Sequence, residues 1–461
     1  MMTKLVHEIR DPIHIFIRLD SEERTILDSR PVQRLRHIHQ LALTSLVYPA
    51  ATHRRFEHSL GVMELAGRVY DVVTNPDHLL EGERGIVHKP GTFDHTYWRR
   101  VVRLAALCHD IGHLPFSHAA EKDLLPAGWD HERLTLELIL NSSLAHDFEK
   151  IKVQPKDVAK LAVGPKKYRD EPFEVWEAIF SELIVGDAFG VDRMDYLLRD
   201  SHHSGVAYGR FDHFRLIDTL RILPKVGSPE RAAPPPSEGS AEPEPKSTEE
   251  PFAAEGEPTL GVEQGGLHST EALLLARYFM YSQLYFHPVR RIYDIHLKEF
   301  LKQWLPAGKF STELEDHLRL TDNEVNAALL DAARDPGKPG HDPARRIVGH
   351  RHYKLLYQRN PDDLRINPDA AKAIYESACG QFGDTNVYYD SYKEKGRALD
   401  FPVLTRDSRV VSGLTLSDTL GRVPVVAVDY VFICPERHKD ADQWLQRNRP
   451  DIIAPKVEGQ S

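Results

Sequence analysis

The segment from Arg99 to His118 constrains the fold of this chain more than any other stretch of the sequence. Its first part, Arg99–Asp110, is apolar at helical spacing and predicts a buried helix that ends before Pro115. Three histidines and one carboxylate lie at the end of this helix and just beyond it: His109, Asp110, His113 and His118. So many neighbouring polar groups are not expected in an ordinary hydrophobic core, because each buried one needs a hydrogen-bond partner. The segment therefore predicts a core helix whose carboxyl end carries a functional site.

Apolar residues follow the helical period in much of the remaining chain, which predicts a mainly α fold. This spacing is found in residues 60–73, 176–185, 192–200, 270–284, 314–333 and 345–358. Alternation in 13–19, and β-branched runs in 423–428 and 430–434, predict small β elements. We expect a helical bundle with small β elements and a C-terminal α+β lobe.

Composition divides the chain into four segments. Residues 226–258 hold eight glutamates, only two basic residues and hardly an apolar one, so we expect an acidic, Pro/Glu-rich, disordered insertion. It separates a core at 1–225 from a helical continuation of that core at 259–359. The small lobe then occupies 360–461.

Charge and composition exclude several classes of partner. The formal net charge of −10 argues against a basic nucleic-acid-binding surface, so we expect no nucleic-acid partner. The chain is 41% hydrophobic and 28% charged and has no apolar stretch of membrane-spanning length, which predicts a soluble protein with no membrane partner. Three cysteines without paired spacing, and a charged N-terminal stretch, predict a cytoplasmic location.

The His109–Asp110 pair has candidate partners elsewhere in the sequence. His58 lies upstream in Arg-Arg-Phe-Glu-His-Ser-Leu-Gly, and Asp192 lies downstream in Val-Asp-Arg-Met-Asp-Tyr. Imidazole and carboxylate together suit Fe, Mn, Zn, Ni or Mg rather than a thiolate-seeking metal. The order His, His-Asp, Asp resembles the HD phosphohydrolase superfamily, in which these four side chains hold a metal. The resemblance implies that His58, His109, Asp110 and Asp192 bind one divalent transition metal, Fe, Mn, Zn or Ni, with an additional Mg²⁺ as a second cofactor.

Three further motifs narrow the resemblance to one branch of the superfamily. Residues 30–36, 55–62 and 112–118 look like the dNTP triphosphohydrolases, whereas the Asp-Xaa-Xaa-Glu-Asp and Gly-Tyr-Pro signatures of other branches do not accompany His109. The similarity extends over about 5–225 and 259–357. It implies an enzyme that converts a dNTP and water into a deoxynucleoside and triphosphate.

The reaction requires proton transfer, for which imidazoles near neutral pH are suited. His113, His118 and His131 are the candidates, and the resemblance places the last two near the reacting phosphate. We expect His131 to be the general acid, with Glu132 or Glu121 orienting an imidazole.

Substrate residues are implied by the same resemblance. They are Gln40, Arg55, Arg193, Tyr196, Asp200, Arg277, Tyr281 and Tyr285. The three arginines would bind the phosphates, Tyr196 would pack against the sugar, and Gln40 with Asp200 would bond the 3′-hydroxyl. Asp192, Tyr196 and Asp200 recur every four residues and so share one side of a helix, although Tyr196 could also be an ordinary core aromatic. The human member of the family has a histidine in place of Tyr281 and a glutamine in place of Phe286, so the base preference stays open.

A second nucleotide site is also implied, and with it a homo-oligomer, dimer or tetramer. Asp28, Gln33 and Arg36 stand where the family binds an activating guanine nucleotide, whose edges suit a carboxylate and a guanidinium. His7 replaces a lysine there, which removes charge at neutral pH. The alternative is structural, with Asp28 capping a helix that begins near Pro31.

Two other functions remain open from the residues alone. An HD phosphatase acting on nucleoside monophosphates or another phosphate ester would use the same metal ligands but would not need three spaced arginines. A nucleotide-sensing or single-stranded nucleic-acid-binding module would be expected to interleave aromatic and basic residues, a pattern that the basic runs lack.

Overall fold

The structure is a computed structural model that describes residues 7–117, 121–226, 256–393 and 399–454. Most of the acidic insertion, and His118, lie outside the described residues. In the part of the chain that is described, no helix combines the length and the apolar character needed to cross a membrane.

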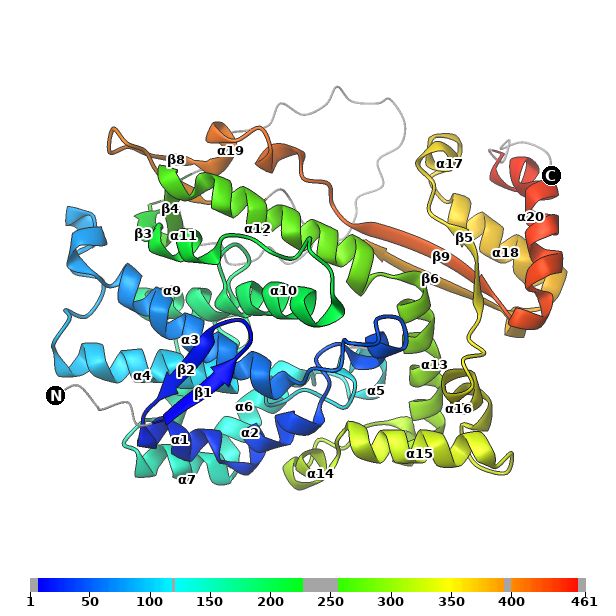
Figure 1. The fold of residues 1–461 in the computed structure, drawn as a ribbon, viewed down its shortest axis with the longest axis horizontal. Coiled ribbons are helices and arrows are strands. Elements are labelled where there is room, and N and C mark those ends of the chain that lie inside the picture. The colour runs from blue at the N-terminus through cyan, green and yellow to red at the C-terminus, as the bar shows by residue number, and fades with distance from the viewer. Residues whose placement is uncertain (1–6, 118–120, 227–255, 394–398, 455–461) are drawn as a thin grey trace.

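The N-terminal two thirds of the chain form a helical body around one large hydrophobic core (Figure 1). Its helices are α1 (Ser21–Leu27), α2 (Arg30–Arg34), α3 (Arg55–Val73), α4 (Phe93–Cys108), α5 (Glu121–Leu124), α6 (His131–Asn141), α7 (Ser143–Lys150), α8 (Pro155–Val163), α9 (Val175–Val185), α10 (Val191–Ser204), α11 (His213–Asp218) and α12 (Leu267–Met280). The helix α3 packs against α4 on one side and α10 on another. The three helices that were expected to carry metal ligands are therefore neighbours.

The remainder of the chain adds helices around smaller hydrophobic clusters. These are α13 (Pro288–Trp304), α14 (Leu314–Arg319), α15 (Asp322–Arg334), α16 (His341–Val348), α17 (Pro361–Ile366), α18 (Ala370–Phe382), α19 (Gly413–Leu416) and α20 (His438–Ile453). In Figure 1, α13 links the helical body to α15 and α16, and the α18–α20 pair lies beyond the long β6 and β9 strands.

Three small sheets complete the described fold. The hairpin β1 (His7–Asp11) and β2 (Ile15–Leu19) is antiparallel and pairs His7 with Leu19. A four-stranded sheet has the order β3-β4-β7-β8, from β3 (Leu220–Pro224), β4 (Pro258–Glu263), β7 (Pro402–Leu404) and β8 (Val410–Ser412). A three-stranded sheet has the order β5-β9-β6, from β5 (Lys354–Gln358), β6 (Val387–Lys393) and β9 (Ala427–Ile433). The prediction of a mainly α fold with small β elements is confirmed.

Strand pairing joins segments that are far apart in the sequence. The strands β3 and β4 are antiparallel neighbours, so the acidic insertion connects two paired strand ends, Pro224 and Pro258. The strand β7 runs parallel to β4, while β9 pairs with β5 and β6. Residues after 360 thus contribute to two different sheets, and the division into four segments stays a prediction.

Local chemistry explains where the expected elements were wrong. The helix expected at 345–358 ends at Val348, because Gly349 and the left-handed His350 (φ 52°) break it before strand β5. The helix expected at 314–333 is two helices, since Thr321 caps α15 through a bond from the Asn323 N–H. The two expected strands at 423–434 form the single strand β9, and the helix at 270–284 ends as a π-helix, Tyr281–Tyr285.

Candidate metal centre and active site

His58, His109 and Asp110 form the one group among the described residues whose side chains could hold a metal ion. His58 comes from the first turn of α3, and the other two follow α4 directly. All three are buried, and each offers one ligand atom within 4.8 Å of the others. Asp192, in the first turn of α10, lies close to both imidazoles, with Oδ1 at 3.0 Å from His58 Nε2 and 3.4 Å from His109 Nε2. The four residues expected as ligands therefore converge, with Asp192 on the more exposed side.

Both imidazoles are hydrogen-bonded through Nδ1, and His58 Nε2 is bonded in addition to Oδ1 of Asp192, itself a candidate ligand. His109 Nδ1 donates to the carbonyl of Ala106 at 2.7 Å, and His58 Nδ1 donates to Asp195 Oδ2 at 2.8 Å. His109 Nε2 is buried without a hydrogen-bond partner among the described residues. A neutral imidazole that donates through one nitrogen presents a lone pair on the other. The donor set thus fits a divalent transition metal.

Electrostatics at this cluster favour positive charge. Burial alone would lower the pKa of His58, but its hydrogen bonds to Asp192 and Asp195 outweigh burial and raise that pKa to about 10. Burial would raise the pKa of Asp110, but the charges of Arg55, His109 and His113 hold it well below its usual range. The carboxylates are therefore ionised at neutral pH and attract a cation.

Arg55 binds a metal ligand rather than pointing freely into the site. Its Nη1 pairs with Asp110 Oδ2, and its Nε and Nη2 donate to Ser117 Oγ at 2.9 and 2.8 Å. Ser117 and the preceding Phe116 both have φ of 57°, which is rare for such residues and marks a strained turn beside the site. The turn that follows the ligands is thus tied back to α3.

A second pair of histidines stands beside Asp110. His113 Nε2 lies 3.1 Å from Asp110 Oδ1, and the His113 ring stacks on that of His131 with centroids 4.1 Å apart. Glu121 Oε1 accepts from both the backbone N–H and Nδ1 of His131, each at 2.8 Å. Of the two carboxylates expected to orient His131, Glu121 does so, whereas Glu132 pairs with Lys167 at 2.6 Å.

The two stacked imidazoles differ in protonation. Burial, Arg55 and His131 lower the pKa of His113 well below its usual value. Burial also acts to lower the pKa of His131, but the bond to Glu121 outweighs it and raises that pKa. Of the two rings, His131 is therefore the one that keeps a proton to the higher pH.

Asp200 lies two turns after Asp192 on α10 and is almost completely buried. Its Oδ1 lies 2.7 Å from His53 Nε2, and its Oδ2 accepts from the Tyr285 hydroxyl at 2.7 Å. The Tyr285 ring is 6.1 Å from that of Tyr196 and 5.0 Å from that of Tyr281. The π-helix therefore places Tyr281 and Tyr285 beside Tyr196 of α10, and these three rings form an aromatic wall. A π-helix of this kind is often found at a functional site.

The remaining substrate candidates lie near this wall. The Arg277 guanidinium lies 5.6 Å from the centre of the Tyr281 ring. Arg193 donates through Nη1 to the Gly186 carbonyl at 3.4 Å, and its Nε is buried without a partner among the described residues. Gln40 Oε1 is likewise buried and unpartnered in the described part of the chain, while its backbone N–H bonds the His53 carbonyl. The structure therefore brings these candidates into the same region as the metal group.

Comparison with known proteins places this geometry in a family. The HD domain model matches residues 55–164, and the model of an HD associated region matches residues 255–371. The chain therefore contains an HD domain, the domain that defines the HD-domain phosphohydrolase superfamily.

Several individual proteins are similar to this chain in sequence or structure. An uncharacterized protein of Methanocaldococcus jannaschii is 36% identical over 290 residues, 63% of this chain and 48% of that protein. The deoxynucleoside triphosphate triphosphohydrolase SAMHD1 of Gallus gallus is 27% identical over 431 residues, 85% of this chain and 62% of that enzyme. A hypothetical protein of Aquifex aeolicus has a similar solved structure, with a TM-score of 0.73, 28% identity, and coverage of 96% of this chain and 100% of that one. The chain spans between about half and three fifths of the length of the first two relatives.

The expected second nucleotide site lies on the surface of the HD protein. Asp28 is exposed and pairs with Arg24 at 3.1 Å, and Arg24 also contacts His7 Nδ1 at 2.9 Å. Arg36 donates to Gln33 Oε1 at 2.8 Å, and its guanidinium lies 3.5 Å from the centre of a phenylalanine ring on α3. Asp28 does not cap α2, whose N-cap is Ser29, so the structural alternative for Asp28 is wrong.

Several residues of the candidate site were not predicted from the sequence. Asp195 bonds the outer nitrogen of His58 and is itself bonded to His14 and Arg199, and His53 bonds Asp200. The spacing of Asp195 and Arg199, four residues apart on a helix, is a detectable ion-pair pattern. The contribution of His14 depends on a contact across 181 positions, which no local pattern reveals.

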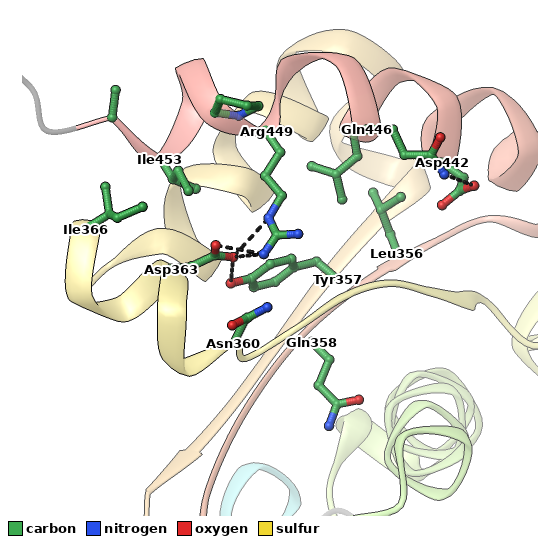
Figure 2. A pocket seen from close by; sticks show the side chains of 13 residues that line it. Leu356, Tyr357, Gln358, Asn360, Asp363, Ile366, Asp442, Gln446, Arg449 and Ile453 are labelled. Atoms are coloured by element: carbon green, nitrogen blue, oxygen red, sulfur yellow. Dashed lines mark hydrogen bonds and ion pairs between the residues drawn. The ribbon is translucent and has the colours of Figure 1, made fainter.

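A cavity of about 830 Å³ lies in the C-terminal part of the HD protein, away from the metal group (Figure 2). Residues of β5, α17 and α20 line it, and Arg449, Asp363 and Tyr357 are bonded together within it. None of the expected site residues lines this cavity.

Proposed function

We propose that this protein is a metal-dependent dNTP triphosphohydrolase, which converts a dNTP and water into a deoxynucleoside and inorganic triphosphate. The observation that carries the proposal is that one helix, α10, presents Asp192 to the metal group and Asp200 to an aromatic wall two turns later. A site that handles a phosphate at one end and a nucleoside at the other needs this arrangement. The named activity of the Gallus gallus relative supports the same reading.

Under this proposal His58, His109, Asp110 and Asp192 hold one divalent transition metal, Fe, Mn, Zn or Ni, and an additional Mg²⁺ accompanies the triphosphate. The bound metal supplies charge neutralisation for the phosphoryl oxygens and lowers the pKa of a water. The Arg55–Asp110 pair keeps the carboxylate of that ligand ionised and oriented.

In the proposed reaction, a histidine of the chain supplies the proton for the leaving group. Water attacks the α-phosphorus, the bond from that phosphorus to the 5′-oxygen breaks, and His131 donates its proton to the departing 5′-oxygen. His131 suits this role because the bond to Glu121 raises its pKa, whereas the pKa of the neighbouring His113 is lowered well below its usual value.

The nucleoside end of the proposed substrate lies against the tyrosines. Tyr196 packs against the sugar, Gln40 and Asp200 bond the 3′-hydroxyl, and Tyr281 and Tyr285 face the base. Asp200 enters this role already bonded to His53 and Tyr285, so it is a fixed acceptor rather than a mobile one. Arg193 and Arg277, which approach from α10 and α12, are the cations proposed to bind the phosphates.

We also propose that the enzyme is a homo-oligomer activated by a guanine nucleotide at Asp28, Gln33 and Arg36. The support is that the structure leaves these groups at the surface and gathers Arg24 and His7 beside Asp28. The site is distinct from the metal group.

A substrate panel tests the proposal against its alternatives. Wild-type protein with Mn²⁺ is offered dNTPs, ribonucleoside triphosphates, deoxynucleoside monophosphates and a simple phosphate ester. Turnover of dNTPs alone is expected. Preferential turnover of monophosphates or esters would favour an HD phosphatase, and binding without turnover of any of them would favour a sensing module.

A further inference from the structure

Asp195 is the centre of a buried hydrogen-bonded cluster that ends at the metal group. Its Oδ2 accepts from His58 Nδ1 at 2.8 Å, and its Oδ1 lies 2.6 Å from His14 Nε2. Arg199, one turn later on α10, donates to both carboxylate oxygens at 2.8 and 3.0 Å. The side chains of all four residues are at most 1% exposed.

The N-terminal hairpin supplies the other side of this cluster. Asp11, at the end of β1, accepts from Arg199 Nη1 at 2.9 Å. The same carboxylate accepts from the backbone N–H groups of Ile13 and His14 at 2.9 and 2.8 Å, and so shapes the turn that carries His14. Ile15, which follows, has a φ of 69°, a conformation that β-branched residues rarely adopt. The hairpin turn is therefore held in an unusual form by its contacts to α10.

The charges within the cluster do not cancel. Two buried carboxylates, Asp11 and Asp195, share the single guanidinium of Arg199. Asp195 thus retains negative charge toward His58, and a carboxylate that accepts from one ring nitrogen fixes the tautomer and raises the basicity of the other. The carboxylate also has no room to retreat, because a Cβ on Gly61 would lie 1.9 Å from Asp195 Oδ1.

We propose that Asp195, held in place by His14 and Arg199, is the positioning residue that sets the tautomer and orientation of the metal ligand His58. The N-terminal hairpin would then be a structural part of the metal centre, although it contributes no ligand. This inference rests on the proposed metal centre and extends it beyond the four ligands.

Metal affinity in full-length protein tests the proposal without relying on turnover. Mn²⁺ binding is measured by titration calorimetry for wild type, Asp195→Asn, His14→Leu and His14→Gln. Asp195→Asn is expected to weaken Mn²⁺ binding by about 10- to 100-fold, the usual effect of losing such a partner. His14→Leu removes the donor to Asp195 and should weaken binding, whereas His14→Gln keeps an N–H donor and should restore most of the affinity.

Two comparisons keep the result interpretable. Arg18→Ala, which removes an exposed ion pair with Glu8 on the same hairpin, should bind Mn²⁺ like wild type. If Asp195→Asn fails to fold by circular dichroism, the two His14 variants decide, because they leave the Asp195 carboxylate in place. Unchanged affinity in Asp195→Asn, or equal affinity in the two His14 variants, would overturn the positioning role. Wild-type protein that binds no Mn²⁺, Fe²⁺, Zn²⁺ or Ni²⁺ would overturn the metal centre itself.

Discussion

Gly112, in the turn that carries the candidate ligands His109 and Asp110, lies directly against the start of helix α6. A Cβ at this position would lie 2.1 Å from the carbonyl oxygen of His131 and 2.4 Å from the backbone nitrogen of Thr135. The Gly112 N–H also donates to Thr135 Oγ1 at 3.0 Å, and that hydroxyl donates to the His109 carbonyl at 3.1 Å. We predict that Gly112→Ala forces the ligand-bearing turn away from the first turn of α6.

The size of the effect follows from what the methyl group meets. Overpacking of a filled interior costs about 1–3 kcal/mol, and both clashing groups here are backbone, so the upper end applies. Replacing Gly by Ala offsets about 0.7 kcal/mol of this through the lower entropy of the unfolded chain. The free energy of unfolding should therefore fall by about 2 kcal/mol. Because His131 moves relative to His113, a displacement of about 1 Å should also lower kcat by about 100-fold.

Urea unfolding followed by circular dichroism measures the first effect, and steady-state turnover measures the second. Gly380→Ala is the matched control, since nothing lies within 4 Å of a Cβ placed on this exposed helical glycine. Gly380→Ala should raise the free energy of unfolding by about 0.5–1 kcal/mol, because alanine has a higher helix propensity than glycine. A Gly112→Ala protein with wild-type stability and kcat would show that the contact between the turn and α6 is not as close as described.

Four further outcomes are expected. Asp110→Ala should lose stoichiometric metal in elemental analysis together with turnover, and a metal-replete, active variant would contradict the ligand assignment. Glu121→Gln removes the negative charge through which Glu121 raises the pKa of His131, so the alkaline limb of the kcat–pH profile should move to lower pH; an unmoved limb would remove His131 as the acid. Deleting 228–256 should leave turnover intact because the insertion joins two paired strand ends, and a folded but inactive deletion variant would contradict this. GTP or dGTP should increase dNTP hydrolysis and the mass measured by light scattering, and Arg36→Ala should abolish the activation while sparing basal turnover; unchanged rate and mass in wild type would remove the regulatory site.

The sequence predicted the elements that carry the candidate ligands because their signal is local or family-specific. The apolar spacing before His109 predicted helix α4, and its polar end marked the site. His58 and Asp192 came from the resemblance, since nothing in their own neighbourhoods distinguishes a ligand from a buried polar residue. The structure adds the reason that α3, α4 and α10 carry them, namely that these helices pack side by side.

Tertiary contacts decided what the sequence left open or misread. Glu121 and Glu132 are equally plausible partners of His131 in sequence, and only the packing of α5 against the start of α6 selects Glu121. The segment 354–358 was expected to be the end of a helix, and its pairing with β9 makes it a strand instead. The Asp195 cluster needed a contact between the first hairpin and α10, which no periodicity contains.

The phosphorus products of dATP hydrolysis show whether this protein is a dNTP triphosphohydrolase. Wild-type protein is incubated with dATP and Mn²⁺, and the products are resolved by phosphorus NMR and chromatography, with a chelated sample as the reference. We expect inorganic triphosphate and deoxyadenosine in equal amounts, and neither product after chelation of the metal. Orthophosphate or pyrophosphate as the primary product, or triphosphate release that survives removal of the metal, would contradict this proposal.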